Sequence, residues 1–67
     1  MKQAVEHARK AVLGAPNEAK YRQTLARAYA AANMKESAIG ELERASALAP
    51  SDDTIKEQIR RARRGEF

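Results

Sequence analysis

Residues 17–50 read NEAKYRQTLARAYAAANMKESAIGELERASALAP, and their apolar side chains recur at the spacing of one helix face. This spacing predicts helices over about residues 18–32 and 35–48. Asn33 is the expected left-handed residue that ends the first of them, and Pro50 ends the second. Because the connection at Asn33 is short, we expect the two helices to pack as an antiparallel hairpin.

The segments on either side of this hairpin each predict one further helix. The first covers about residues 2–13, and Gly14 is expected to end it in a left-handed conformation. The second covers about residues 52–64 and is expected to start at Ser51 as its N-cap, as the helix from residue 18 starts at Asn17. Strand patterns are nearly absent, so the fold class is all-α.

The chain also repeats itself with a period of 34 residues, the distance between Pro16 and Pro50. The same shift superposes Ala4 on Ala38, Val5 on Ile39, Ala8 on Leu42, Ala11 on Ala45, Leu25 on Ile59 and Ala28 on Ala62. Matches at one fixed spacing are the signature of a helical repeat.

Residues at seven positions carry a more specific pattern, namely Leu25, Ala26, Tyr29, Ala38, Leu42, Ala45 and Pro50. At this spacing the segment resembles the tetratricopeptide repeat (TPR) family. It departs from the family in two places, because Arg22 stands where the family has tryptophan and Asn33 stands where it has glycine.

The resemblance implies a single domain over residues 1–67, built from antiparallel helix hairpins stacked as a short right-handed solenoid. Residues 2–13 would then be the second helix of a partial repeat, residues 17–50 a complete repeat and residues 51–64 a capping helix. Arg60 stands where Ala26 stands in the complete repeat, and a bulky charged residue there favours a polar outer face on the last helix.

Composition excludes most catalytic and metal-binding chemistry. The 67 residues contain no cysteine and one histidine, His7, so neither a thiolate metal site nor a histidine cluster is expected. There is no glycine-rich phosphate loop, and the adjacent carboxylates Asp52 and Asp53 are interpreted as stabilising a helix start. We therefore expect no enzyme and no cofactor.

No apolar run is long enough for a membrane span, and a cytoplasmic protein is the default expectation. The formal net charge of +4 permits an acidic partner but does not require one.

Binding of a peptide or a partner protein, as a scaffold or adaptor, is the function that the TPR resemblance implies. The family uses the concave face of its stacked helices, which here would present Lys20, Gln23, Arg27 and Ala30, together with Thr54, Glu57, Gln58 and Arg61. Arg27 and Arg61 are one period apart, so the two guanidinium groups are expected to lie on neighbouring helices and to receive a carboxylate. Some family members clamp acidic chaperone tails with a lysine, but Gln23 and Glu57 occupy the corresponding positions and argue against that clamp.

Two alternatives remain open at this stage. The first helix lacks the partner that would precede it in a full repeat, so its apolar stripe of Ala4, Val5, Ala8 and Val12 suggests homodimerisation or the C-terminal end of a longer array. A lesser alternative is binding of a nucleic-acid backbone by the arginines of residues 60–64.

Overall fold

The computed structural model describes residues 2–66, which form four helices and no strand, and so confirms the all-α class. The helices are α1 (Lys2–Gly14), α2 (Ala19–Ala31), α3 (Lys35–Leu48) and α4 (Asp53–Arg63). The predicted bounds of α3 are correct, and those of the other helices differ from the structure by one residue at one or both ends.

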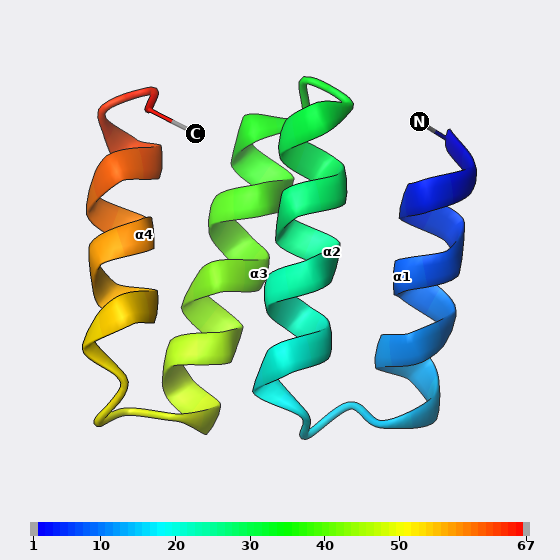
Figure 1. Cartoon of the computed structure of the whole chain (residues 1–67), viewed down its shortest axis with the longest axis horizontal. Coiled ribbons are helices and arrows are strands. Elements are labelled where there is room, and N and C mark those ends of the chain that lie inside the picture. Colours follow the sequence, from blue (N-terminus) through cyan, green and yellow to red (C-terminus); the bar gives the residue numbers. More distant parts are fainter. Residues whose placement is uncertain (1, 67) are drawn as a thin grey trace.

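The helices lie side by side in chain order, each antiparallel to the one before it (Figure 1). Their Cα atoms span 27 × 25 × 13 Å, so the molecule is a thin slab about one to two helices deep. Extensive contacts join consecutive helices, and the largest interface is the one between α2 and α3. The predicted hairpin is therefore the centre of the molecule, with α1 and α4 packed on its two sides.

Left-handed residues end α2 and α4. Asn33 has φ 63°, as its position predicts, and Gly65 has φ 80°. At each end, two backbone N–H groups donate back to the last turn, as in Met34 N to Tyr29 O (2.8 Å) and Glu66 N to Arg61 O (2.8 Å). This pattern satisfies carbonyl groups that a helix end otherwise leaves without partners.

Gly14 does not behave in this way. It belongs to α1 and has no left-handed conformation, so the expected left-handed exit at this glycine is wrong.

The predicted N-caps are also wrong, and both are wrong for the same reason. Pro16 and Asn17 are the central residues of a turn closed by Glu18 N donating to Ala15 O (3.1 Å), so α2 starts one residue later, after Glu18. The equivalent turn around Pro50 is closed by Asp52 N donating to Ala49 O (3.0 Å). The residue after each proline is used by the turn, so it cannot cap the helix.

The actual cap of α4 is Asp52, whose carboxylate accepts from Thr54 N at 2.9 Å and Ile55 N at 3.4 Å. The corresponding cap of α2 is Glu18, which makes no such side-chain bond.

The interior consists of two small clusters that share one aromatic residue. Between α1 and α2, Ala8, Val12 and Leu25 are buried together. Between α2, α3 and α4, the second cluster consists of Ala26, Ala38, Leu42 and Ala62, and Ala45 of α3 and Ile55 of α4 are buried outside both clusters. Tyr29 packs against both clusters and so joins the two halves of the slab.

Arg22 of α2 belongs to a charged network that reaches α3 and the turn before α2. The guanidinium group donates from Nη1 to Glu41 Oε1 (2.9 Å) and from Nε to Pro16 O (3.1 Å), while Arg44 Nη1 donates to Glu41 Oε2 (2.7 Å). The Glu41 side chain is only 7% exposed and the Arg22 side chain 17%. Because Arg22 contacts both α3 and the turn that precedes α2, it fixes the hairpin and its entrance together.

Replacing Ala38 with leucine should destabilise the fold, because Ala38 is fully buried in the α2–α3 interface and has no room for a larger side chain. We expect the free energy of unfolding to fall by about 1–3 kcal/mol, measured by urea denaturation. The matched control is Ala47→Leu at an exposed position of the same helix, which should change it by less than about 0.5 kcal/mol. Equal losses in the two variants would contradict the packing described.

Replacing Glu41 with alanine should leave the partly buried Arg22 without its counter-ion. The expected loss is about 1–3 kcal/mol in the free energy of unfolding. Glu43→Ala is the control, because Glu43 is half exposed and pairs with Arg63 on the surface, where an ion pair contributes at most about 1 kcal/mol. If the two variants are equally stable, Glu41 does not anchor Arg22.

Candidate functional site

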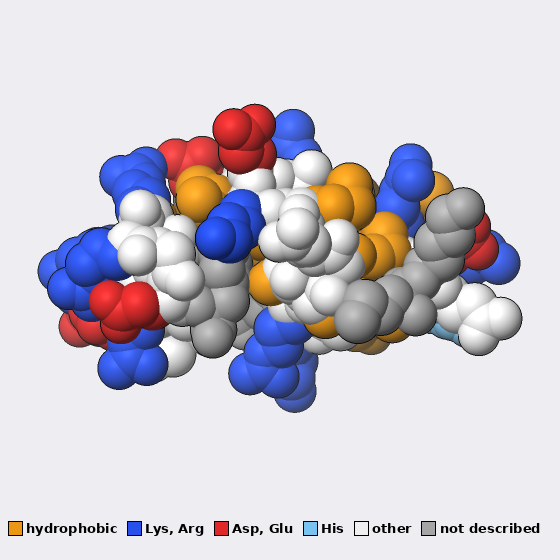
Figure 2. Space-filling view, turned by 90° about the horizontal axis from the view of Figure 1, so that it is seen from above, with side chains coloured by type: hydrophobic (Ala, Val, Ile, Leu, Met, Phe, Trp, Pro, Cys, Tyr) orange, Lys and Arg blue, Asp and Glu red, His pale blue; other side chains and the backbone are white. Residues whose placement is uncertain are grey.

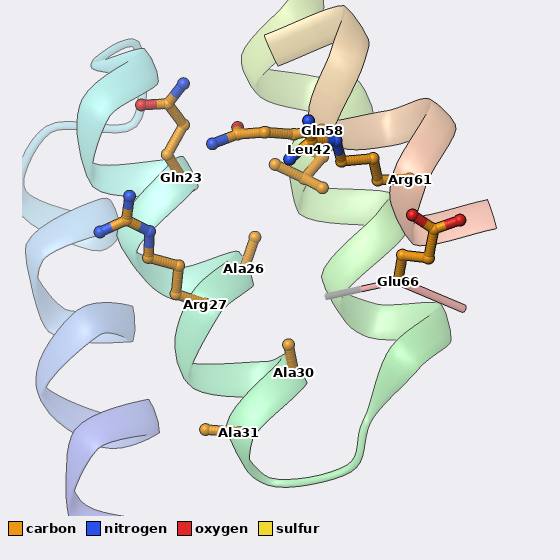
Figure 3. A pocket seen from close by; sticks show the side chains of 9 residues that line it. All are labelled: Gln23, Ala26, Arg27, Ala30, Ala31, Leu42, Gln58, Arg61 and Glu66. Carbon is orange, nitrogen blue, oxygen red and sulfur yellow. The ribbon is translucent and has the colours of Figure 1, made fainter. Parts of the chain in front are cut away.

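A hollow of about 740 Å³ opens between α2 and α4, over the middle of α3. Its floor is apolar, with Ala26 of α2 and Leu42 of α3 in the centre (Figure 3). The remaining residues around it are Gln23, Arg27, Ala30, Ala31, Gln58, Arg61 and Glu66. The hollow exists because alanines line the α2 side, where larger side chains would fill the space.

Four polar side chains border this floor, and the guanidinium group of Arg27 extends to the side of α2 away from α4 (Figure 3). Gln23 and Arg27 extend from α2, while Gln58 and Arg61 extend from α4 (Figure 3). Arg27 is exposed and makes no ion pair or side-chain hydrogen bond with any residue from 2 to 66. The hollow therefore combines an apolar base with a cation that is not neutralised by the described part of the chain.

The structure brings together five of the eight side chains predicted for the concave face, namely Gln23, Arg27, Ala30, Gln58 and Arg61. Thr54 and Glu57 line a smaller adjoining hollow of about 410 Å³ on α4, which shares Gln58 and Arg61 with the larger one. Lys20 is exposed on the first turn of α2 and borders neither hollow.

Sequence reasoning missed four residues of the larger hollow. Ala26 and Leu42 were assigned to packing between helices alone, yet they also form its floor. Ala31 and Glu66 were not considered for the concave face at all. Glu66 reaches the hollow because the left-handed Gly65 turns the chain back over the end of α4, and that glycine was the available signal.

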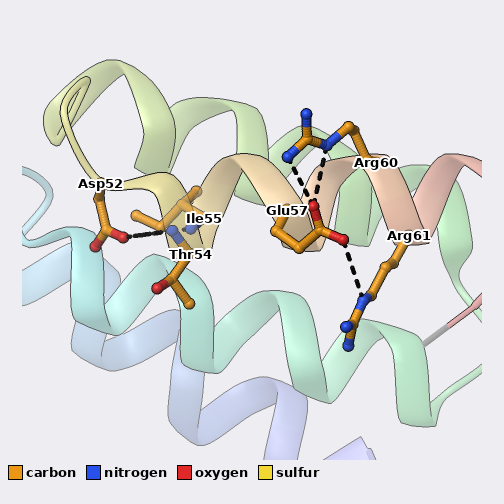
Figure 4. Close-up of polar contacts among 6 residues, drawn as sticks. All are labelled: Asp52, Thr54, Ile55, Glu57, Arg60 and Arg61. Atoms are coloured by element: carbon orange, nitrogen blue, oxygen red, sulfur yellow. Dashed lines mark hydrogen bonds and ion pairs between the residues drawn. The ribbon is translucent and has the colours of Figure 1, made fainter.

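Glu57 is the centre of an ion-pair cluster on α4 (Figure 4). Its Oε2 accepts from Arg60 Nη2 at 2.7 Å and Nε at 3.1 Å, and its Oε1 lies 3.4 Å from Arg61 Nε. The hydrogen bond and charge of Arg60, and to a lesser extent the charge and hydrogen bond of Arg61, hold the pKa of the Glu57 carboxyl below its usual value. Glu57 is therefore a carboxylate at neutral pH and binds two arginines at once.

One polar atom at the edge of the larger hollow is buried without a partner within residues 2–66. Gln58 Oε1 is buried and has no hydrogen-bond partner among the described residues. A buried acceptor without a donor is unfavourable, so the Gln58 amide gains from any donor that enters the hollow.

The four arginines near the C-terminus are already paired with carboxylates. Arg60 and Arg61 pair with Glu57, Arg63 with Glu43 at 2.7 Å, and Arg64 with Glu66 at 3.3 Å. Acidic and basic side chains accordingly alternate at the α4 end of the molecule (Figure 2). This mixing leaves less positive charge for a phosphate backbone than the sequence suggested.

The apolar stripe expected to form a bare edge on α1 lies largely inside the molecule. Ala8 and Val12 are buried against Leu25, and Val5 is half-buried beside them. Only Ala4 is exposed, so three of these four residues already serve the contact between α1 and α2. The expectation that the stripe is free for self-association is therefore wrong for Ala8 and Val12.

Residues 2–66 were compared with the requirements of a metal site and of a membrane-spanning helix. No group of three or more metal-binding side chains is assembled there. His7 is an exposed residue whose Nδ1 lies 2.8 Å from Gln3 O. None of the described helices combines the length and apolar character that crossing a bilayer needs.

Comparison of the chain with protein-family models, with curated proteins and with solved structures finds no match.

The Glu57 carboxyl should titrate at a lower pH than an ordinary glutamate. Because its pKa is lower in the folded than in the unfolded chain, its contribution to stability is present above the unfolded value and disappears as the pH falls through the folded value. We expect the Glu57 side-chain ¹³C chemical shift to report this titration. Arg60→Gln should raise the pKa of Glu57 more than Arg61→Gln does, since Arg60 is the larger cause. The opposite order would contradict the hydrogen bonding described.

Proposed function

We propose that the chain is a TPR-like protein-interaction module that binds an acidic segment of a partner protein in the hollow between α2 and α4. The observation that carries the proposal is Arg27, an exposed cation beside an apolar floor for which the described residues supply no counter-ion. A carboxylate provides the hydrogen-bond geometry that a guanidinium group matches best. An apolar neighbour in the partner would lie over the half-buried Ala30 and the exposed Ala31, next to the buried Ala26 and Leu42.

Two features support the solenoid part of this proposal. The turns around Pro16 and Pro50 have the same hydrogen bond, from Glu18 N to Ala15 O and from Asp52 N to Ala49 O, at the 34-residue spacing of the sequence repeat. The extensive contacts run from each helix to the next, as stacked repeats require. Arg60 at the outer face of α4 is 69% exposed, consistent with a polar cap.

The size of the hollow limits what it can hold. About 740 Å³ accommodates a few residues of an extended segment, and its open, shallow form leaves much of the ligand in water. The affinity of the isolated chain for a short peptide should therefore be weak, with a dissociation constant on the order of 0.1–1 mM.

Arg27→Gln should weaken the binding of an acidic peptide. The probe is a blocked peptide of alternating glutamate and leucine, and its glutamine–leucine counterpart tests for the role of charge. We expect the acidic peptide to bind the wild-type chain more tightly than the neutral one, and to lose about three- to tenfold in affinity on Arg27→Gln, measured by ¹⁵N chemical-shift titration.

The control for this experiment is Arg9→Gln, which removes the same charge from an exposed position of α1 that does not line the hollow. This variant should bind as the wild type does. Equal binding of the acidic and neutral peptides, or equal losses in the two variants, would overturn the proposed site.

A further inference from the structure

Arg61 is held on one side by a carboxylate of its own helix and faces the hollow with the other. Glu57 Oε1 lies 3.4 Å from Arg61 Nε, and Arg61 makes no second ion pair within the part of the chain that the structure describes. The Arg61 side chain is 61% exposed and lines both hollows, so it has room to move between them. Figure 4 shows the side chain held back toward Glu57.

We propose that Glu57 is an internal competitor for Arg61, which a carboxylate of the partner must displace, so that Glu57 sets how acidic a segment must be to bind. This inference rests on the proposed function. In this view the affinity of the hollow for acidic segments is set by the Glu57–Arg61 ion pair and not by Arg61 alone.

The geometry of Glu57 indicates that releasing Arg61 costs little free energy. Arg60 binds Oε2 through two nitrogens, at 2.7 and 3.1 Å, whereas the contact of Arg61 Nε with Oε1 is longer, at 3.4 Å. When Arg61 leaves, Glu57 keeps its stronger partner and remains ionised. Arg60 therefore holds the competitor in place, and Arg61 is the group that is released.

The pair should discriminate between ligands by charge. A neutral polar group gains too little from Arg61 to replace a carboxylate, because hydrogen bonds between two charged groups are about twice as strong as neutral ones. A ligand with a single carboxylate can be held by Arg27, which has no such competitor among the described residues. Full use of both arginines then requires a second carboxylate in the ligand, one that replaces Glu57 at Arg61.

The test is the affinity of the blocked glutamate–leucine peptide for Glu57→Gln. We expect this variant to bind about threefold more tightly than the wild type, since the contribution of an exposed ion pair is lost from the free state only. Glu43→Gln is the matched control, because it removes another arginine-paired carboxylate, 51% exposed against 42% for Glu57, that lines neither hollow. It should leave the affinity unchanged, and circular dichroism should show equal helix content in all variants.

A double-mutant cycle separates displacement from a general effect of charge. In an Arg61→Gln background, Glu57→Gln should no longer increase the affinity, because there is no cation left to release. A gain that persists in that background, or no gain from Glu57→Gln alone, would overturn the inference while leaving the proposed function intact. If the wild type does not prefer the acidic peptide to the neutral one, the proposed function fails and the inference fails with it.

The ion pair can also be followed without any ligand. In the chain without peptide, the Arg61 Nε–H resonance should shift on Glu57→Gln, because the carboxylate that lies 3.4 Å from this nitrogen is removed. A resonance that is insensitive to Glu57→Gln would show that the two side chains do not interact in solution, which would contradict the inference.

Discussion

The close approach of α2 and α3 is the constraint on which the rest of the molecule depends. Ala26 and Ala38 are 2% and 0% exposed at this interface, and their small side chains let the two helices come together. Alanine side chains bury little apolar area. Dispersion between the closely packed backbones of α2 and α3 therefore contributes more to this contact than it does in a core of large side chains. The Arg22–Glu41 pair beside it adds a directional link that alanines cannot supply.

The same alanines produce the candidate site. A side chain larger than Ala26 or Ala30 would fill the space between α2 and α4, and the hollow over Leu42 would disappear. The alanines of α2 therefore have two roles. They pack against α3, and they leave the space that forms the hollow. The arginines around it then decide the charge of what can enter.

Much of the fold could be predicted because helix periodicity and punctuation are local properties of the chain. The bounds of α3 follow from apolar spacing, and the left-handed Asn33 follows from its place at the end of α2. The caps could not be predicted from residue preference alone, since a proline turn uses Asn17 and Ser51 before either can cap a helix.

The candidate site was predictable only in part, for a different reason. The repeat period places Arg27 and Arg61 on neighbouring helices, and the structure lines one hollow with both. The partners that charged side chains find on other helices depend on rotamers and on the depth of each position, which no spacing encodes. Arg22 was therefore read as a departure from the family pattern, although its counter-ion Glu41 lies in the same segment. The pairing of Glu57 with Arg61 is different, because the two residues are four positions apart on one helix and this spacing by itself predicts the contact.

The sequential contacts of the four helices also bear on how the chain acquires its structure. Because each extensive interface joins elements adjacent in sequence, no long loop must close before stabilising contacts form. Such a low contact order places the chain among fast folders, with the α2–α3 hairpin as the natural nucleus. The two outer helices each pack mainly on one neighbour, so they are the segments whose backbone amides exchange with solvent first while the hairpin stays closed.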